Sequence, residues 1–117
     1  MSAVSPLHLV RTAGRDSAQD DASLVADLRA DRPGALLRIW DRHAAVVRGV
    51  LRRALDPRGD VEDQVQEVFL AFHRSAHELR DPALLRAYLV GIATRKAISE
   101  LRRRKVRSFL RSVMGAC

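Results

Sequence analysis

The apolar positions of this chain recur at steps of three and four residues, which is the period of an amphipathic α-helix. Four such segments succeed one another from residue 21 onward, each with a polar opposite face. No segment alternates with the two-residue period of a β-strand. The pattern therefore predicts an all-α fold, a compact helical bundle of about four helices.

The first two segments are separated by a proline-glycine turn. The first begins at Asp21, which we expect to cap it, and it buries Leu24 and Leu28 on one face. The second begins with Pro33 at its first position, where a helical φ suits and no N–H is needed, and it ends at the turn over residues 56–59. Its apolar stripe contains Leu36, Ile39, Trp40, His43, Val46, Val47, Val50, Leu51, Ala54 and Leu55.

The third and fourth segments also begin with capping residues. Asp60 is the expected N-cap of the third, and Asp81 with Pro82 begins the fourth, which should continue to about Ser108. The inward face of the third contains Val61, Val65, Val68, Phe69 and Phe72. The apolar face of the fourth contains Leu85, Tyr88, Leu89, Ile92, Ala93, Ala97, Ile98 and Leu101.

A length of 117 residues suits a single domain. Residues 1–20 show no sustained period, and we expect a flexible leader there. The helical domain should span residues 21–108, with a short tail or the start of a linker over residues 109–117.

The net charge of +7 is confined to one segment. Residues 95–111 contain eight basic residues and one acid, Glu100, so the rest of the chain sums to zero. Offsetting a helix dipole needs only about two or three cations. A longer basic tract is typical of proteins that bind a polyanion, most often nucleic acid and sometimes an anionic membrane surface. The tract favours a nucleic-acid partner.

Cys117 is the only cysteine, so the chain has no intrachain disulfide and fits a reducing compartment. No stretch reaches the roughly 18 apolar residues of a spanning helix, and the N-terminus has no signal-peptide core. We expect a cytoplasmic protein with no membrane insertion.

The sequence gives little support to an enzyme. The four histidines are scattered; His73 and His77 are one helical turn apart but have no third ligand near them in the sequence. No glycine-rich phosphate loop or nucleophile elbow is present. We expect no catalytic residue, no cofactor and no metal site.

One face of the third segment carries polar residues around a leucine. Asp63, Gln66, Glu67, Leu70 and Arg74 fall there at helical spacing. Directional polar contacts around a small apolar anchor suit a protein-docking surface. Ordinary solvated helix faces have the same composition, so both interpretations remain open from the residues alone.

Two runs in the second half of the chain resemble region two of the extracytoplasmic-function (ECF) sigma factors. Residues 60–74, DVEDQVQEVFLAFHR, are similar to the family pattern acid-x-x-D-x-x-QEVFL. Residues 86–105, RAYLVGIATRKAISELRRRK, are similar to the pattern R-A-W-L-x-x-I-A-x-N-x-A-I-D-x-L-R-R-R. The resemblance covers residues 23 to about 107, with the two motifs in the family's order behind the helix of Trp40.

The resemblance implies that the third helix docks on core RNA polymerase. The clamp helices of the largest catalytic subunit would bind a face made of Asp63, Gln66, Glu67, Leu70 and His73. This favours the docking interpretation of that face. An anti-sigma factor is a further partner that the resemblance suggests.

The resemblance also implies that the fourth helix engages the minus-ten element of promoter DNA. Flipping a base costs roughly a few kcal/mol of stacking, which an aromatic surface and nearby cations offset. Arg80, Arg86 and Tyr88 are the candidates for that contact. Tyr88 also suits core packing, and the two roles are compatible. The cations that would hold backbone phosphates are Arg95, Lys96, Arg102, Arg103, Arg104 and Lys105.

We therefore expect a sigma-like module that binds core polymerase and promoter DNA in transcription initiation. The alternative is a non-initiating regulatory or truncated module that occupies polymerase or an anti-sigma protein. We expect this chain to lack the family's second DNA-binding domain. We expect region two alone, as a fragment, a truncated reading frame or a natural single-domain protein.

Overall fold

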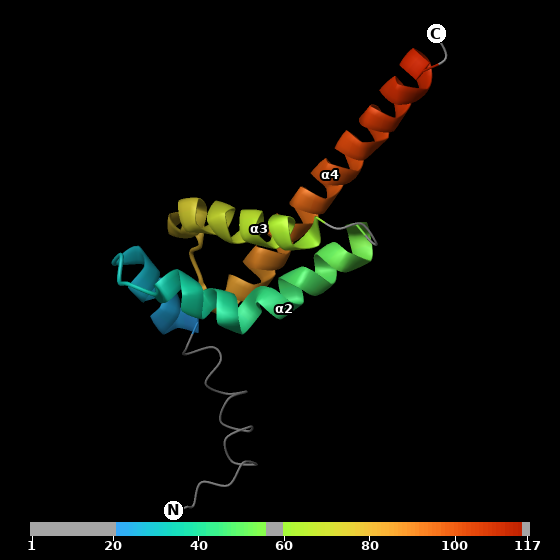
Figure 1. The fold of residues 1–117 in the computed structure, drawn as a ribbon. Coiled ribbons are helices and arrows are strands. Elements are labelled where there is room, and N and C mark those ends of the chain that lie inside the picture. Colours follow the sequence, from blue (N-terminus) through green and yellow to red (C-terminus); the bar gives the residue numbers. More distant parts are fainter. Residues whose placement is uncertain (1–20, 56–59, 116–117) are drawn as a thin grey trace, which may run out of the picture.

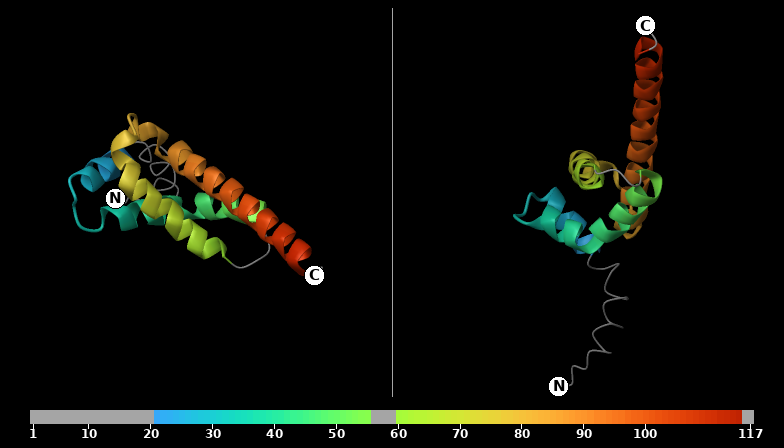
Figure 2. Two further views of the ribbon diagram at one scale, coloured as in Figure 1. Left: turned by 90° about the horizontal axis from the view of Figure 1, so that it is seen from above. Right: turned by 45° about the vertical axis from the view of Figure 1, so that its right-hand side comes forward.

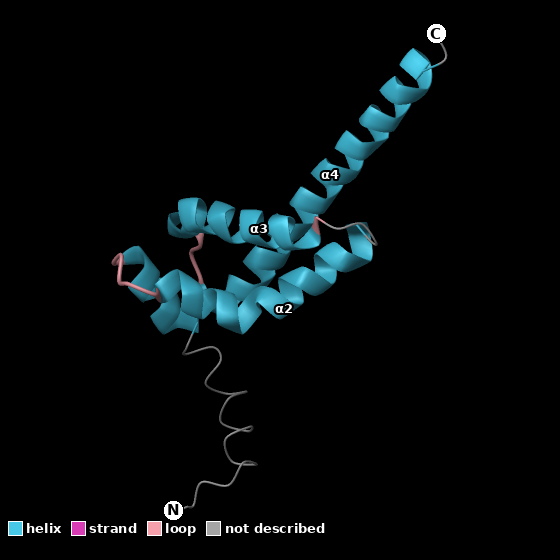
Figure 3. Ribbon diagram, in the orientation of Figure 1, coloured by secondary structure: helices cyan, strands magenta, loops and turns pink. Residues whose placement is uncertain are grey.

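The computed structural model describes residues 21–55 and 60–115, and all regular structure in these ranges is helical (Figure 1, Figure 3). This confirms the expected all-α helical bundle. The leader expected over residues 1–20 and the turn over residues 56–59 lie outside the described residues.

Helical residues 21–29 precede three long helices. The further elements are α2 (Ala35–Leu55), α3 (Val61–Ser75), the single-turn 3-10 helices η1 (Ala76–Glu78) and η2 (Pro82–Leu84), and α4 (Leu85–Gly115). Each of α2, α3 and α4 packs against the other two.

The apolar stripes of these helices meet in one core. Phe69 and Phe72 of α3, Ile39 and Leu51 of α2 and Leu89 of α4 are all buried in it. Each buried Leu, Ile or Phe side chain contributes roughly 1.5–3 kcal/mol to folding. Burial, more than helix propensity, therefore holds the helices together.

Residues 21–29 end in a Schellman motif. The Arg32 N–H donates to the Asp27 carbonyl at 2.9 Å, and the Asp31 N–H donates to the Leu28 carbonyl at 3.0 Å. This motif needs a left-handed residue, and Asp31 has a φ of 58°. An aspartate therefore holds a conformation that glycine adopts without steric cost.

The start of α2 differs from the expectation. Pro33 does not open the helix, because Gly34 comes next with a φ of 79° and breaks the helical run. The Ala35 N–H donates to the Arg32 carbonyl at 3.3 Å, which closes a turn of type II with proline and glycine in its central positions. The helix begins after this turn, at Ala35.

The expected capping role of Asp21 is also wrong. Asp21 is itself helical and buried, and its Oδ1 lies 2.9 Å from Nε2 of His43. The Arg42 Nε lies 3.8 Å from the same oxygen. The carboxylate therefore joins the first helical segment to α2, since a buried charge requires partners.

An ion pair with α2 holds the first turn of α3. Asp60 occupies the expected N-cap position, yet its side chain makes no capping hydrogen bond. Arg48 instead donates to both carboxylate oxygens of Glu62. The hydrogen bond from Arg48 lowers the pKa of Glu62, and the same bond raises the pKa of Arg48.

The fourth segment begins as expected, with a 3-10 turn added. The Asp81 carboxylate accepts a hydrogen bond from the Ala83 N–H at 3.0 Å, and Pro82 occupies the first helical position. This turn is η2, and the α-helix proper starts at Leu85.

The helix α4 extends beyond the bundle. It continues to Gly115 rather than to about Ser108, and its last buried residue is Glu100, so its final turns project into solvent (Figure 1, Figure 2). Ile98 and Leu101, expected on the apolar face, are 46% and 43% exposed, because α4 turns the side of Ala97 and Glu100 toward the bundle there. Within the described ranges, no helix has the length and hydropathy that crossing a membrane requires.

The left-handed Asp31 gives a test of the connection before α2. We expect Asp31→Gly to raise the free energy of unfolding by about 1 kcal/mol, because glycine removes the steric cost of a positive φ. Asp41→Gly is the control: Asp41 is an exposed residue inside α2, and glycine there should lower stability by about 1 kcal/mol. Urea denaturation measures both, and equal losses would contradict this description of the connection.

Candidate functional site

The docking residues predicted on α3 form one exposed ridge. We call Asp63, Gln66, Glu67, Leu70 and His73 the α3 ridge; all five are exposed. The opposite face of the same helix is buried in the core. Leu70 is 46% exposed although it is large and apolar. The ridge thus has the composition that the sequence predicts, an apolar anchor among acids and an amide.

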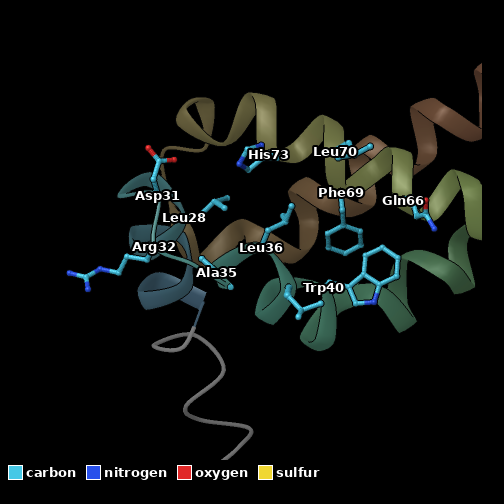
Figure 4. A pocket seen from close by; sticks show the side chains of 12 residues that line it. Leu28, Asp31, Arg32, Ala35, Leu36, Trp40, Gln66, Phe69, Leu70 and His73 are labelled. Atoms are coloured by element: carbon cyan, nitrogen blue, oxygen red, sulfur yellow. The ribbon is translucent and has the colours of Figure 1, made fainter.

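A groove that the sequence did not indicate borders the ridge. Gln66, Leu70 and His73 form one wall of it, and Leu36, Leu37 and Trp40 of α2 contribute to the opposite side (Figure 4). The groove encloses about 540 Å³. Leu37, which lies off the predicted apolar stripe, is 63% exposed at its edge.

Two aromatic rings pack against each other in the lining of this groove. The rings of Trp40 and Phe69 lie 4.9 Å apart with an interplanar angle of 53°, and Phe69 is buried. Aromatic pairs at such distances contribute about 0.5–1.5 kcal/mol beyond the area that they bury. An apolar groove with polar residues at its rim suits the side chains of a protein partner.

A salt bridge joins the α3 ridge to α4. The Lys96 ammonium lies 3.8 Å from Oε1 of Glu67, and both side chains are partly exposed. A predicted docking residue thus contacts a predicted phosphate-binding residue. Exposed pairs of this kind contribute about 0–1 kcal/mol, so a stronger partner for either group can break it.

The loop between α3 and α4 is held by Arg29, a residue that the sequence did not indicate. Its guanidinium donates to the carbonyl oxygens of Ala76, at 2.9 Å, and of Leu79. Buried backbone carbonyls need such partners. Arg29 therefore positions the loop in which Arg80 lies.

Arg80 and Tyr88 share a hollow of about 400 Å³. The remaining lining residues are Glu78, Leu79, Asp81, Leu84 and Ala87. Arg86 is exposed but is not among these lining residues. The structure thus brings together two of the three residues predicted to contact a flipped base.

Tyr88 is anchored at both ends of its ring. Its hydroxyl donates to Oγ of Ser75 at 2.9 Å, and its ring meets Phe72 edge-to-face at 5.9 Å. The side chain is half-buried. It is therefore a packing residue that also lines the hollow, and its contact with a base stays a prediction.

Three cations surround a second hollow between α3 and α4. Arg74, Arg95 and Lys96 line it, and its volume is about 570 Å³. The other polar lining residues are Ser75, Ser99, Tyr88 and one acid, Glu78. Arg95 and Lys96 are predicted phosphate contacts, whereas Arg74 comes from α3. Cations and hydroxyls at one concave surface can bind the oxygens of a phosphate.

The cations further along α4 divide into two groups. Arg103 and Arg104 form ion pairs with the buried Glu100, at 2.9 Å and 3.3 Å. Arg104 also donates to the Leu55 carbonyl at 3.1 Å, which caps the end of α2. Arg102 and Lys105 are exposed and have no ion pair among the described residues. Arg104 therefore has a structural role: it holds α4 against the end of α2.

The comparisons with known proteins give one match. A family model described as sigma-70 region 2 matches residues 39–113, more than half of the chain. No curated protein matches, and no solved structure matches. Within the described residues, no group of three potential metal ligands occurs.

The anchoring of Tyr88 can be tested by its hydroxyl. We expect Tyr88→Phe to lower the free energy of unfolding by about 1 kcal/mol, because it removes a part-buried hydrogen bond and keeps the ring. Ser75→Ala removes the acceptor Oγ together with its own hydrogen bond to the Ala71 carbonyl, so the double variant should lose less than the sum of the two single losses. Urea denaturation of the four proteins measures this, and additive losses would contradict the pairing.

Proposed function

Because the chain belongs to the sigma-70 region 2 family and has its sigma-factor-like role in transcription initiation, we propose that it is an ECF-type module with two separate contacts. The α3 ridge docks on the clamp helices of the largest subunit of core RNA polymerase. The loop and α4 engage the minus-ten element of promoter DNA.

The observation that carries the proposal is the α3 ridge beside its groove. A partner helix can place acceptors and donors against Gln66 and Glu67 while an apolar side chain enters between Leu70 and Trp40. Polar pairing gives orientation, and the buried apolar contact supplies most of the affinity. This combination supports docking over an ordinary solvated face.

The shared hollow of Arg80 and Tyr88 supports the minus-ten contact. A flipped base needs an apolar or aromatic wall, here the ring edge of Tyr88 with Leu84, and a nearby cation, here Arg80. Arg95 and Lys96 follow Tyr88 along α4 and line the second hollow. A DNA strand that leaves the hollow of Arg80 and Tyr88 would pass this second hollow. Their role would be to hold its phosphates.

The alternative function is a module that occupies polymerase, or binds an anti-sigma protein, without initiating. It is favoured by one observation: Arg103 and Arg104 are engaged with Glu100, which leaves fewer cations for DNA. Both functions require a docking surface, and they differ only in whether the docked protein goes on to start transcription.

Docking is tested by capture of the protein on bacterial core RNA polymerase. We expect Gln66→Ala with Glu67→Lys to weaken capture at least about tenfold, because a central polar pair is lost and one charge is reversed. Asp41→Lys is the matched control: it makes the same charge reversal on an exposed part of α2 and should leave capture unchanged. Undiminished capture of the ridge variant would reject the docking surface.

Promoter contact is tested with the polymerase complex on a pre-melted minus-ten promoter. Each phosphate contact to a single strand contributes about 0.7 to the slope of log affinity against log salt. Arg95→Ala with Arg102→Ala should therefore reduce that slope by about 1.4. Abortive transcripts measured in the same reactions separate the two functions, since docking without any product supports the alternative.

A further inference from the structure

The projecting end of α4 carries an apolar stripe of its own. We call Val106, Phe109, Leu110, Val113 and Met114 the tip stripe; their side chains are between 49% and 71% exposed. Neither the polymerase contact nor the promoter contact proposed above uses these residues. Isolated helices of a few turns are marginal in water, so a helix that exposes such a stripe is stabilised when a partner covers it.

The stripe has the spacing of a helix-pairing seam. Val106, Phe109 and Val113 are separated by three and four residues, as in a heptad repeat. A hollow of about 490 Å³ lies at the first turns of the stripe. Val106 and Leu110 line it, together with Ser99 and three arginines. A hollow with an apolar base can receive one side chain of a facing helix.

The charges around the stripe are all of one sign. Residues 101–115 contain six cations and no acid. At 100° per residue, Arg107 and Arg111 border the stripe on the side of Met114, and Lys105 borders it on the side of Phe109. These are the flanks from which coiled-coil partners exchange salt bridges. The complementary partner has acidic flanks.

We propose that the tip stripe is a docking surface for an acidic amphipathic helix of another protein. The apolar face of that helix covers Val106, Phe109 and Leu110, and one of its side chains enters the hollow. Its carboxylates pair with the cations on both flanks. Opposite charge selects this partner by steering it and by disfavouring basic ones.

A second copy of this chain and a lipid surface fit less well. Two tip stripes facing each other would bring their cations together, and like charges at the flanks of a pair of helices oppose association. An anionic membrane attracts the cations but offers no side chain for the hollow, and Phe109 is the single aromatic residue in the stripe.

The experiment uses the full chain and a fluorescent synthetic peptide. The peptide has about three heptads with leucine at positions a and d and glutamate at e and g. Fluorescence anisotropy should detect its binding to the wild-type protein. Val106→Glu with Leu110→Glu should weaken binding at least about tenfold, because both residues line the hollow.

A matched control separates shape from charge. Ser108→Glu with Gly115→Glu adds the same number of charges on the side of the helix opposite the stripe, and it should change affinity by no more than about threefold. Val106→Ala with Leu110→Ala keeps the helix propensity and the charge, and should still weaken binding about tenfold. Circular dichroism verifies that each variant is folded.

Four results would overturn the proposal. Two concern the peptide: the two glutamate pairs weaken its binding equally, or a scrambled peptide of the same composition binds equally well. The other two replace the peptide: the protein does not bind it, and the tip stripe instead mediates binding to phosphatidylglycerol vesicles or dimerisation of the protein. Capture on core polymerase is measured in parallel; because the proposed docking surface lies on α3, we expect it to stay unchanged in all these variants. The proposed function and this inference therefore fail separately.

Discussion

The packing of the first half of α4 against α2 and α3 is the constraint on which both candidate surfaces depend. Leu85, Leu89 and Ile92 enter the core from α4, and Arg104 closes the contact by donating to the last carbonyl of α2. Glu100, buried beside it, requires Arg104 for charge compensation. Because these contacts fix the position of α4 along the bundle, they also fix where its exposed cations lie relative to α3.

The same packing separates protein docking from DNA contact while keeping them adjacent. One side of α3 borders the groove with α2, and its other side borders the cationic hollow with α4. The salt bridge between Glu67 and Lys96 crosses from one to the other. Because this exposed salt bridge is weak, it connects the two surfaces but does not hold either one rigidly.

Much of the fold could be predicted from the chain because helical periodicity is local. The four segments, the inward face of α3 and the cap at Asp81 were all predictable from spacing and from capping chemistry. Errors occur where a neighbouring residue adopts a different backbone conformation or where a distant partner decides. Pro33 fails to open α2 because Gly34 adopts a left-handed conformation, and Asp21 fails as a cap because its carboxylate faces His43, which lies 22 residues further along the chain.

The sequence by itself determined the helical class, the residues of the α3 ridge and the segment that carries all the excess charge, because each depends only on composition and a 3.6-residue period. Only the tertiary structure decided the rest: the groove beside the ridge, the hydrogen bonds from Arg29 to the loop, the hollow that Arg80 and Tyr88 share, and which arginines form ion pairs. These depend on side chains from different helices meeting in space. Glu100 shows the reason, since one buried carboxylate pairs with two cations of the tract, of which Arg104 is partly buried and Arg103 stays exposed.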